Sequence, residues 1–137
     1  MAGLADYTVI KKHESPQLDN EHRSADVTFA LPADVDINAE AILGVVLDTS
    51  GAAGNMRVNL AVNATPVVPN SIETTDGFTG AIFQTIHEVV APSDSPKGHV
   101  LKAGNNKVTV SLVPVSAADP IGGALRFSDL VLWWRHS

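Results

Sequence analysis

Short runs of alternating apolar and polar residues constrain the fold of this chain more than any other feature. Two runs, 56–63 and 107–112, carry an apolar side chain at every second position: Met56, Val58, Leu60 and Val62 in the first, and Val108, Val110 and Leu112 in the second. A period of two sends successive side chains to opposite faces of a β-strand. The pattern therefore predicts strands with one face in the core and one face in water.

Two further runs, 42–47 and the longer 80–90, predict strands that are more fully buried. Residues 7–10 and 27–31 are also rich in strand-forming types. Glycine, proline and asparagine separate these runs, and all 8 prolines fall in or beside the expected loops. The helix candidate at 37–42 is too short to stand alone. About eight strands at this spacing are typical of an all-β sandwich.

The last expected strand, 125–134, interrupts its own alternation. Strict alternation from Leu125 and Phe127 would bury Asp129 and would expose the apolar positions that follow it, Leu130, Leu132 and Trp134. One extra residue at Ser128–Asp129, a β-bulge, returns these apolar residues to the core face. We therefore expect Trp134 to point into the core and Trp133 to point the other way.

Composition favours a packed domain. The chain has 137 residues, of which 45% are apolar and 18% are charged. A domain of this length buries roughly two-thirds of its unfolded surface, so it folds without covalent cross-links. We expect one domain, 1–137, in which residues 1–24 are an acidic edge segment. Cysteine is absent, which excludes disulfides, thiolate metal sites and thiol nucleophiles.

The charge balance argues against two classes of partner. The net charge is −6, and within residues 1–40 eight acidic residues face three basic ones. A chain with no basic stripe is poorly suited to bind nucleic acid or an anionic membrane. No apolar run is long enough to cross a membrane, and the N-terminal residues do not have the pattern of a secretion signal. We expect a soluble protein whose compartment the sequence leaves open.

Three segments carry a family resemblance. Residues 58–67 read VNLAVNATPV, in the order strand, Asn, small residue and short strand. Residues 101–110 read LKAGNNKVTV, and residues 127–133 read FSDLVLW. Together with Gly77-Phe78 and the run 80–90, these segments resemble the galactose-binding-domain-like jelly rolls, including sugar-binding accessory domains of some glycoside hydrolases. The resemblance covers roughly residues 42–134, with Ala64 and Ala103 standing where the family commonly has Gly and Pro.

The resemblance implies a jelly-roll β-sandwich and favours a non-enzymatic binding module for carbohydrate. Other domains of this fold bind lipids, proteins or DNA ends, or hold an enzyme together, so fold alone leaves the function open. The alternative is a structural or assembly protein that docks onto identical copies or onto another protein through its sheet faces and Trp133.

Catalytic and metal-binding patterns are absent from the sequence. No two of the five histidines, His13, His22, His87, His99 and His136, have a chelating spacing, and we expect them at the surface or in turns. No nucleophile elbow occurs, so we expect no enzyme activity. We also expect no cofactor, although jelly rolls of this resemblance often hold Ca²⁺. The acidic candidates for Ca²⁺ form no compact binding loop: Asp34, Asp36, Asp48, Asp76 and Asp129.

A carbohydrate site needs a flat aromatic side chain beside hydrogen-bonding groups. Two places offer this combination: the segment with Asn70, Asp76 and Phe78, and the pair Trp133 and Arg135. Each aromatic also has a structural interpretation. Phe78 could close one end of the sandwich, and Trp133 could pack against a partner subunit.

The bulge separates the two tryptophans energetically. Trp134→Ala should lower the free energy of unfolding by about 3–5 kcal/mol, because it truncates a large buried aromatic side chain. Trp133→Ala should cost far less in the monomer. Denaturant unfolding at low protein concentration measures both changes, and equal losses would show that the expected register is wrong.

Overall fold

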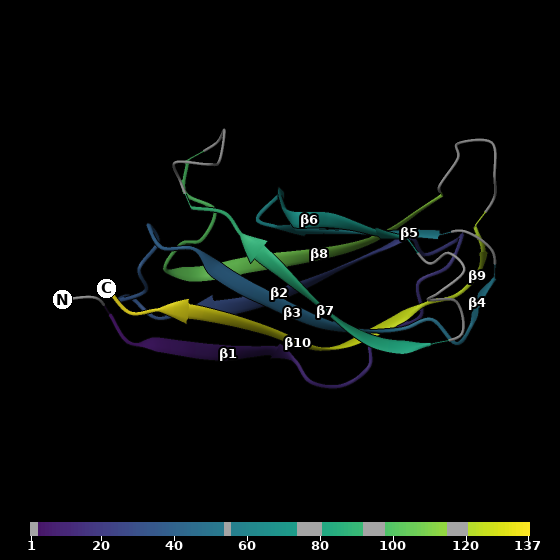
Figure 1. Cartoon of the computed structure of the whole chain (residues 1–137), viewed down its shortest axis with the longest axis horizontal. Helices are drawn as coiled ribbons and strands as arrows, with labels where there is room; N and C mark the ends of the chain where they lie inside the picture. Colours follow the sequence, from purple (N-terminus) through teal and green to yellow (C-terminus); the bar gives the residue numbers. More distant parts are fainter. Residues whose placement is uncertain (1–2, 54–55, 74–80, 92–97, 115–120) are drawn as a thin grey trace.

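The structure is a computed structural model that describes residues 3–53, 56–73, 81–91, 98–114 and 121–137. The described residues form two stacked antiparallel layers (Figure 1). Eight longer strands make up these layers: β1 (Ala5–Lys11), β2 (Ser24–Leu31), β3 (Ala41–Asp48), β5 (Met56–Val62), β6 (Thr65–Glu73), β7 (Ile82–Val89), β8 (Gly104–Pro114) and β10 (Arg126–Arg135). Two short strands, β4 (Ala52–Ala53) and β9 (Gly122–Gly123), pair with each other.

The strand order is β1-β10-β3-β7-β6-β5-β8-β2. We refer to β1, β10, β3 and β7 as the first sheet, and to β6, β5, β8 and β2 as the second sheet. Strand β6 joins them, because it pairs with β5 along most of its length and with β7 through Val68 and Glu88. The apolar core lies between the two sheets. The all-β sandwich predicted from the sequence is confirmed.

Alternation holds in the strands that were expected to be half-buried. In β5 and β8 the apolar positions are buried and the polar positions face outward. The expectation that residues 80–90 form a more fully buried strand is wrong. In β7 the outward Ile82 and Ile86 are 69% and 53% exposed, because none of the described segments covers that side of the first sheet. Ile42, which faces outward on β3, is also exposed.

The expected bulge is present in β10. Its register against β3 shifts between Ser128 and Val131, and Asp129 has a φ of 48°. A left-handed conformation is uncommon outside glycine, and Asp is among the residues that adopt it most readily. Beyond the bulge Trp134 is 5% exposed and Trp133 is 39% exposed. The Trp134 indole N–H donates to Thr8 Oγ1 at 2.9 Å, which ties β10 to β1.

The hairpin between β5 and β6 turns at Asn63 and Ala64. Both residues have positive φ, 48° and 66°, as a two-residue type I′ turn requires. The Asn63 amide donates to the carbonyl of Val100 and to Asn106 Oδ1, each at 2.8 Å. The Asn63 side chain is therefore a structural tie between this hairpin and the segment leading into β8.

Asn106 is the buried centre of that tie. Its amide donates to the carbonyls of Lys102 (2.8 Å) and Gly104 (3.0 Å), and its oxygen accepts from the backbone N–H of Lys102 at 3.1 Å. Gly104 has a φ of 83°, as expected for a turn that favours glycine. Asn106 therefore holds the turn before β8 through bonds to its backbone.

His87 lies in the core rather than at the surface, so its expected position is wrong. It is on the inward face of β7, where its Nδ1 bonds to the carbonyl of Pro69 in β6. A carbonyl only accepts, so Nδ1 carries the hydrogen, and Nε2 accepts from the Thr85 hydroxyl at 2.8 Å. Burial lowers the pKa of His87, while the Pro69 bond opposes that change. The neutral ring links β7 to β6 at the seam between the sheets.

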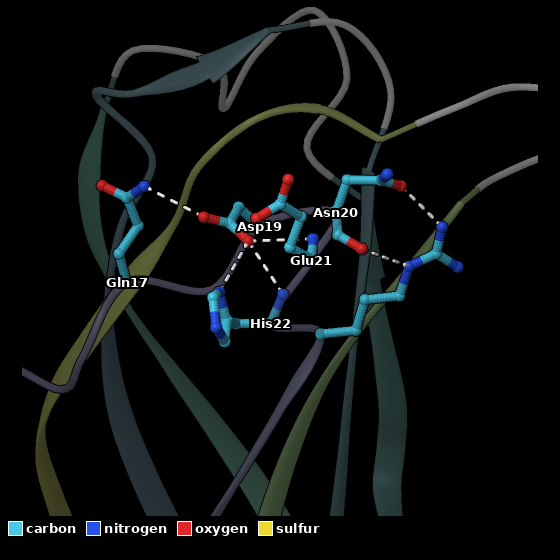
Figure 2. A network of polar contacts seen from close by, with 6 residues as sticks. Gln17, Asp19, Asn20, Glu21 and His22 are labelled. Atoms are coloured by element: carbon cyan, nitrogen blue, oxygen red, sulfur yellow. Dashed lines mark hydrogen bonds and ion pairs between the residues drawn. The ribbon is translucent and has the colours of Figure 1, made fainter.

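Side-chain bonds also hold the connection between β1 and β2 (Figure 2). Asp19 Oδ1 accepts from the backbone N–H groups of Glu21 and His22 at 3.0 and 2.8 Å. These bonds, with the His22 bond the larger cause, lower the pKa of Asp19. The adjacent Leu18 is buried and exchanges backbone hydrogen bonds with Leu125. The connection is therefore fastened to the body of the sandwich.

Removal of the Asn106 side chain tests the tie. Asn106→Ala should lower the free energy of unfolding by about 3 kcal/mol, because it leaves several buried donors and acceptors without partners. Asn105→Ala is the matched control, since the neighbouring side chain is exposed, and it should change stability by less than about 0.5 kcal/mol. Urea unfolding compares the two variants, and similar small losses would contradict a structural role for Asn106.

Candidate functional site

A polar groove lies on the outer face of the second sheet, where β5 and β6 run side by side. It has a volume of about 480 Å³ and is lined by Arg57, Asn59, Asn70, Ser71 and Glu73. Alternation in β5 sends Arg57 and Asn59 outward, and the register places Glu73 and Ser71 directly opposite them. Four side chains from two rigid strands therefore converge on one surface.

The groove is held in shape by its own contacts. The Arg57 guanidinium bonds to Glu73 Oε1 at 2.8 Å, and the Ser71 hydroxyl donates to Asn59 Oδ1, also at 2.8 Å. The groove thus presents a cation, a carboxylate, amides and a hydroxyl in fixed positions. These groups can donate to and accept from a polyhydroxylated ligand without first rearranging.

A second depression surrounds Trp133 on the outer face of the first sheet. Its volume is about 410 Å³, and it is lined by Ala5, Glu40, Ile42, Trp133, Trp134 and Arg135. The Trp133 ring lies over Gly44 of the neighbouring strand β3, because a Cβ added at Gly44 would be 2.9 Å from the ring atom Cζ3. A glycine inside a strand commonly permits such a close approach.

The surroundings of Trp133 are mainly apolar. We define the apolar face as the outward apolar residues of the first sheet between its charged ends: Tyr7, Val9, Val131, Trp133, Ile42, Gly44, Val46 and Ile86. Two polar residues of β7, Gln84 and Glu88, lie on the same side, opposite Val46 and Ile42. Tyr7 is 62% exposed, and Trp133 lies between Tyr7 and Ile42 in register. Charged groups lie at both ends of this face, Glu40 and Arg135 at one end and Asp48 and Arg126 at the other. Within the face, the amide of Gln84 lies beside Gly44.

The residues predicted for ligand binding are divided between these two places. Trp133 and Arg135 share the second depression, whereas Asn70 lines the polar groove. Asp76 and Phe78 lie outside the described residues. Sequence reasoning missed Arg57, Asn59, Ser71 and Glu73. Alternation marked the first two as facing water, but only the β5–β6 register shows which residues stand opposite them.

A histidine clamp fastens the end of the first sheet next to the Trp133 depression. His136 Nδ1 bonds to Asp34 Oδ2 at 2.7 Å, and His136 Nε2 bonds to Asp6 Oδ2 at 2.9 Å. Carboxylates accept, so a ring that donates to both is an imidazolium. The bond to Asp6 and then the bond to Asp34 raise the pKa of His136, and the same His136 bond lowers the pKa of Asp6.

Four of the five carboxylates that were considered for calcium lie in the described residues, and each takes part in local bonding. Asp34 holds His136, Asp36 accepts from the N–H of Asn38, and Asp129 accepts from Ser128. Asp48 lines a third depression and accepts from Ser50, which lowers its pKa. Within the described residues no group of three or more His, Asp or Glu side chains could hold a metal ion. The expectation of no cofactor stays a prediction.

Solved structures share this fold at low sequence identity. A family 35 carbohydrate binding module from Clostridium thermocellum is 12% identical, with 93% of this chain and 97% of that chain covered and a TM-score of 0.51. The C-terminal domain of EclA, described as a sugar-binding protein, is 11% identical, with 96% and 79% covered and a TM-score of 0.50. The likeness confirms the jelly-roll β-sandwich fold.

Sequence comparison adds no relative: no protein-family model and no curated protein matches this chain. Among the described segments there is also no helix of the length and hydropathy needed to cross a membrane.

The histidine clamp predicts a pH-dependent contribution to stability. The folded-state pKa of His136 is raised, so this contribution is complete below its unfolded value of about 6.5 and is lost as pH rises through the folded pKa. The folded pKa of Asp6 is lowered, so its share is complete above about pH 4 and is lost as pH falls. Urea unfolding should show that His136→Asn is most destabilising between about pH 4 and 6.5. A difference that stays constant up to pH 9 would show that the ring is not held as an imidazolium.

Proposed function

We propose that this protein is a carbohydrate-binding module and that the polar groove is its ligand site. The observation that carries the proposal is the convergence of Arg57, Asn59, Ser71 and Glu73 on one preformed surface. The likeness of the fold to a carbohydrate binding module supports the same ligand class. The groove volume of about 480 Å³ lies in the range of small-ligand sites.

The chemistry of the lining suits sugar hydroxyls. Each hydroxyl both donates and accepts, so a site that recognises neighbouring hydroxyls needs both kinds of group at fixed spacing. Arg57 supplies only donors, Glu73 supplies only acceptors, and Asn59 and Asn70 supply both. The ligand is bound by charge-assisted and neutral hydrogen bonds to a rigid pair of strands.

We further propose that the module is non-enzymatic. Glycoside hydrolysis uses two carboxyl groups that flank the scissile bond. Among the described residues that line the polar groove, Glu73 is the single carboxylate, and it is bonded to Arg57. The buried His87 is engaged by Pro69 and Thr85 and does not line the groove.

The apolar face favours the second candidate function, association with protein. Sugar recognition needs polar groups around the aromatic ring, whereas the neighbours of Trp133 within the sheet are mainly apolar. They are Tyr7, Ile42 and Gly44, with the Gln84 amide beside Gly44. This composition is typical of a protein interface. The two functions therefore use opposite faces of the sandwich.

A glycan array identifies the ligand, and calorimetry with the bound sugar tests the groove. Arg57→Ala should weaken binding about 10- to 100-fold, because a hydrogen bond from a charged group contributes about 1.5–3 kcal/mol. Asn59→Ala should weaken it about 5- to 10-fold. Trp133→Ala is the control on the opposite face and should leave the affinity unchanged.

Two results would overturn this proposal. One is the absence of binding to every glycan on the array. The other is loss of binding in Trp133→Ala with full binding in Arg57→Ala, which would assign the sugar to the tryptophan instead of the polar groove.

A further inference from the structure

We infer that the apolar face is the interface of a symmetric homodimer, in which the first sheets of two copies pack face to face. This inference is independent of the ligand proposed above. Large apolar side chains face outward on β3 and β7: Ile42, Ile82 and Ile86 are all exposed in a single copy of the chain.

The other face of the same sandwich provides an internal comparison. The outward positions of β2 and β8 in the second sheet are mostly polar, including Asp26, Thr28, Lys107, Thr109 and Ser111. Both sheets belong to one small domain, and the first sheet carries most of its exposed large apolar side chains: Tyr7, Val9, Ile42, Ile82, Ile86 and Trp133. Large exposed apolar patches on soluble proteins mark interaction surfaces.

The size of the face suits a dimer. Four strands spaced at about 4.8 Å, with about eight residues each at about 3.3 Å, give a flat area of about 500 Å² on each copy. Two copies would bury at least about 1,000 Å², which reaches the lower limit for specific interfaces. Side chains that protrude from the sheet add further surface to this flat estimate. Sheets commonly pack in this way at a separation of about 10 Å.

Charges at the two ends of the face identify a second copy as the partner. At one end Arg135 of β10 and Glu40 before β3 line the same depression. At the other end Arg126 of β10 stands opposite Asp48 of β3 in register. At each end, therefore, β10 contributes a cation and the β3 side contributes an anion.

A two-fold axis that runs along the strands between β10 and β3 brings opposite charges of the two copies together. It places β10 of one copy over β3 of the other, so Arg135 meets Glu40 and Arg126 meets Asp48 across the interface. Between these ends Trp133 faces Ile42, and Val131 faces Gly44. An axis across the strands would instead place Arg135 over Arg126 and Glu40 over Asp48, which opposes like charges. The face is self-complementary in the first arrangement, as a two-fold interface requires.

In this dimer the two second sheets point away from each other. This consequence rests on the proposed function: if the polar groove binds carbohydrate, the dimer presents two sugar sites on opposite sides. Such a protein would bind multivalent glycans with greater avidity than single sugars.

Sedimentation equilibrium of the full chain tests the dimer. The 14.4-kDa protein should approach twice its monomer mass in the micromolar to millimolar range. Ile86→Lys places a charge within the apolar face and should weaken association at least tenfold. Thr28→Lys is the matched control on the polar face and should leave association unchanged. Circular dichroism confirms that both variants remain folded.

A mixing experiment tests the two-fold arrangement. Arg135→Glu alone and Glu40→Arg alone each bring like charges together across the interface, so each variant should be monomeric where the wild type is dimeric. An equal mixture of the two variants should form a heterodimer, because each introduced charge then meets its opposite. A monomeric wild type, an unchanged mass for Ile86→Lys, dissociation by Thr28→Lys or a mixture that stays monomeric would each overturn the proposal.

Discussion

The extra residue at Ser128–Asp129 is the constraint on which the rest of the structure depends. Strand β10 pairs with β1 on one side and with β3 on the other, so its register fixes the whole first sheet. Without the bulge, the apolar residues on one side of it would face water. With it, Phe127, Leu130 and Trp134 all lie in the core. Trp133 is consequently placed on the outer face of the sheet.

The sandwich that results has two different outer faces. The second sheet presents a groove of charged, amide and hydroxyl groups, and the first sheet presents tyrosine, tryptophan and branched apolar side chains. Carbohydrate binding and association with protein were alternatives at the level of the sequence. The two different faces make both proposals compatible. A binding module and an assembling protein can be one molecule when recognition and association use separate faces.

Much of the fold could be predicted because its signals are local. Alternation in 56–62 and the bulge near Asp129 each depend on a few consecutive residues. The candidate site was harder to predict from the sequence. Asn70 was predicted and does line the polar groove, but its partners Arg57 and Glu73 are 16 residues apart and meet only through cross-strand pairing. Register between strands depends on packing as well as on the turn, so no single segment specifies it.

The sequence by itself determined which residues form strands, where those strands turn and which side chains of each strand share a face, because these properties follow from the two-residue period and from turn chemistry. Only the tertiary structure decided which faces are covered. Residues 80–90 have the pattern of a more fully buried strand, yet Ile82 and Ile86 lie on an open surface. His87 has no apolar character, yet it is buried because Pro69 and Thr85 satisfy its ring. Burial depends on which residues of the chain, or of a second copy, pack against a surface. A local sequence pattern does not specify those residues.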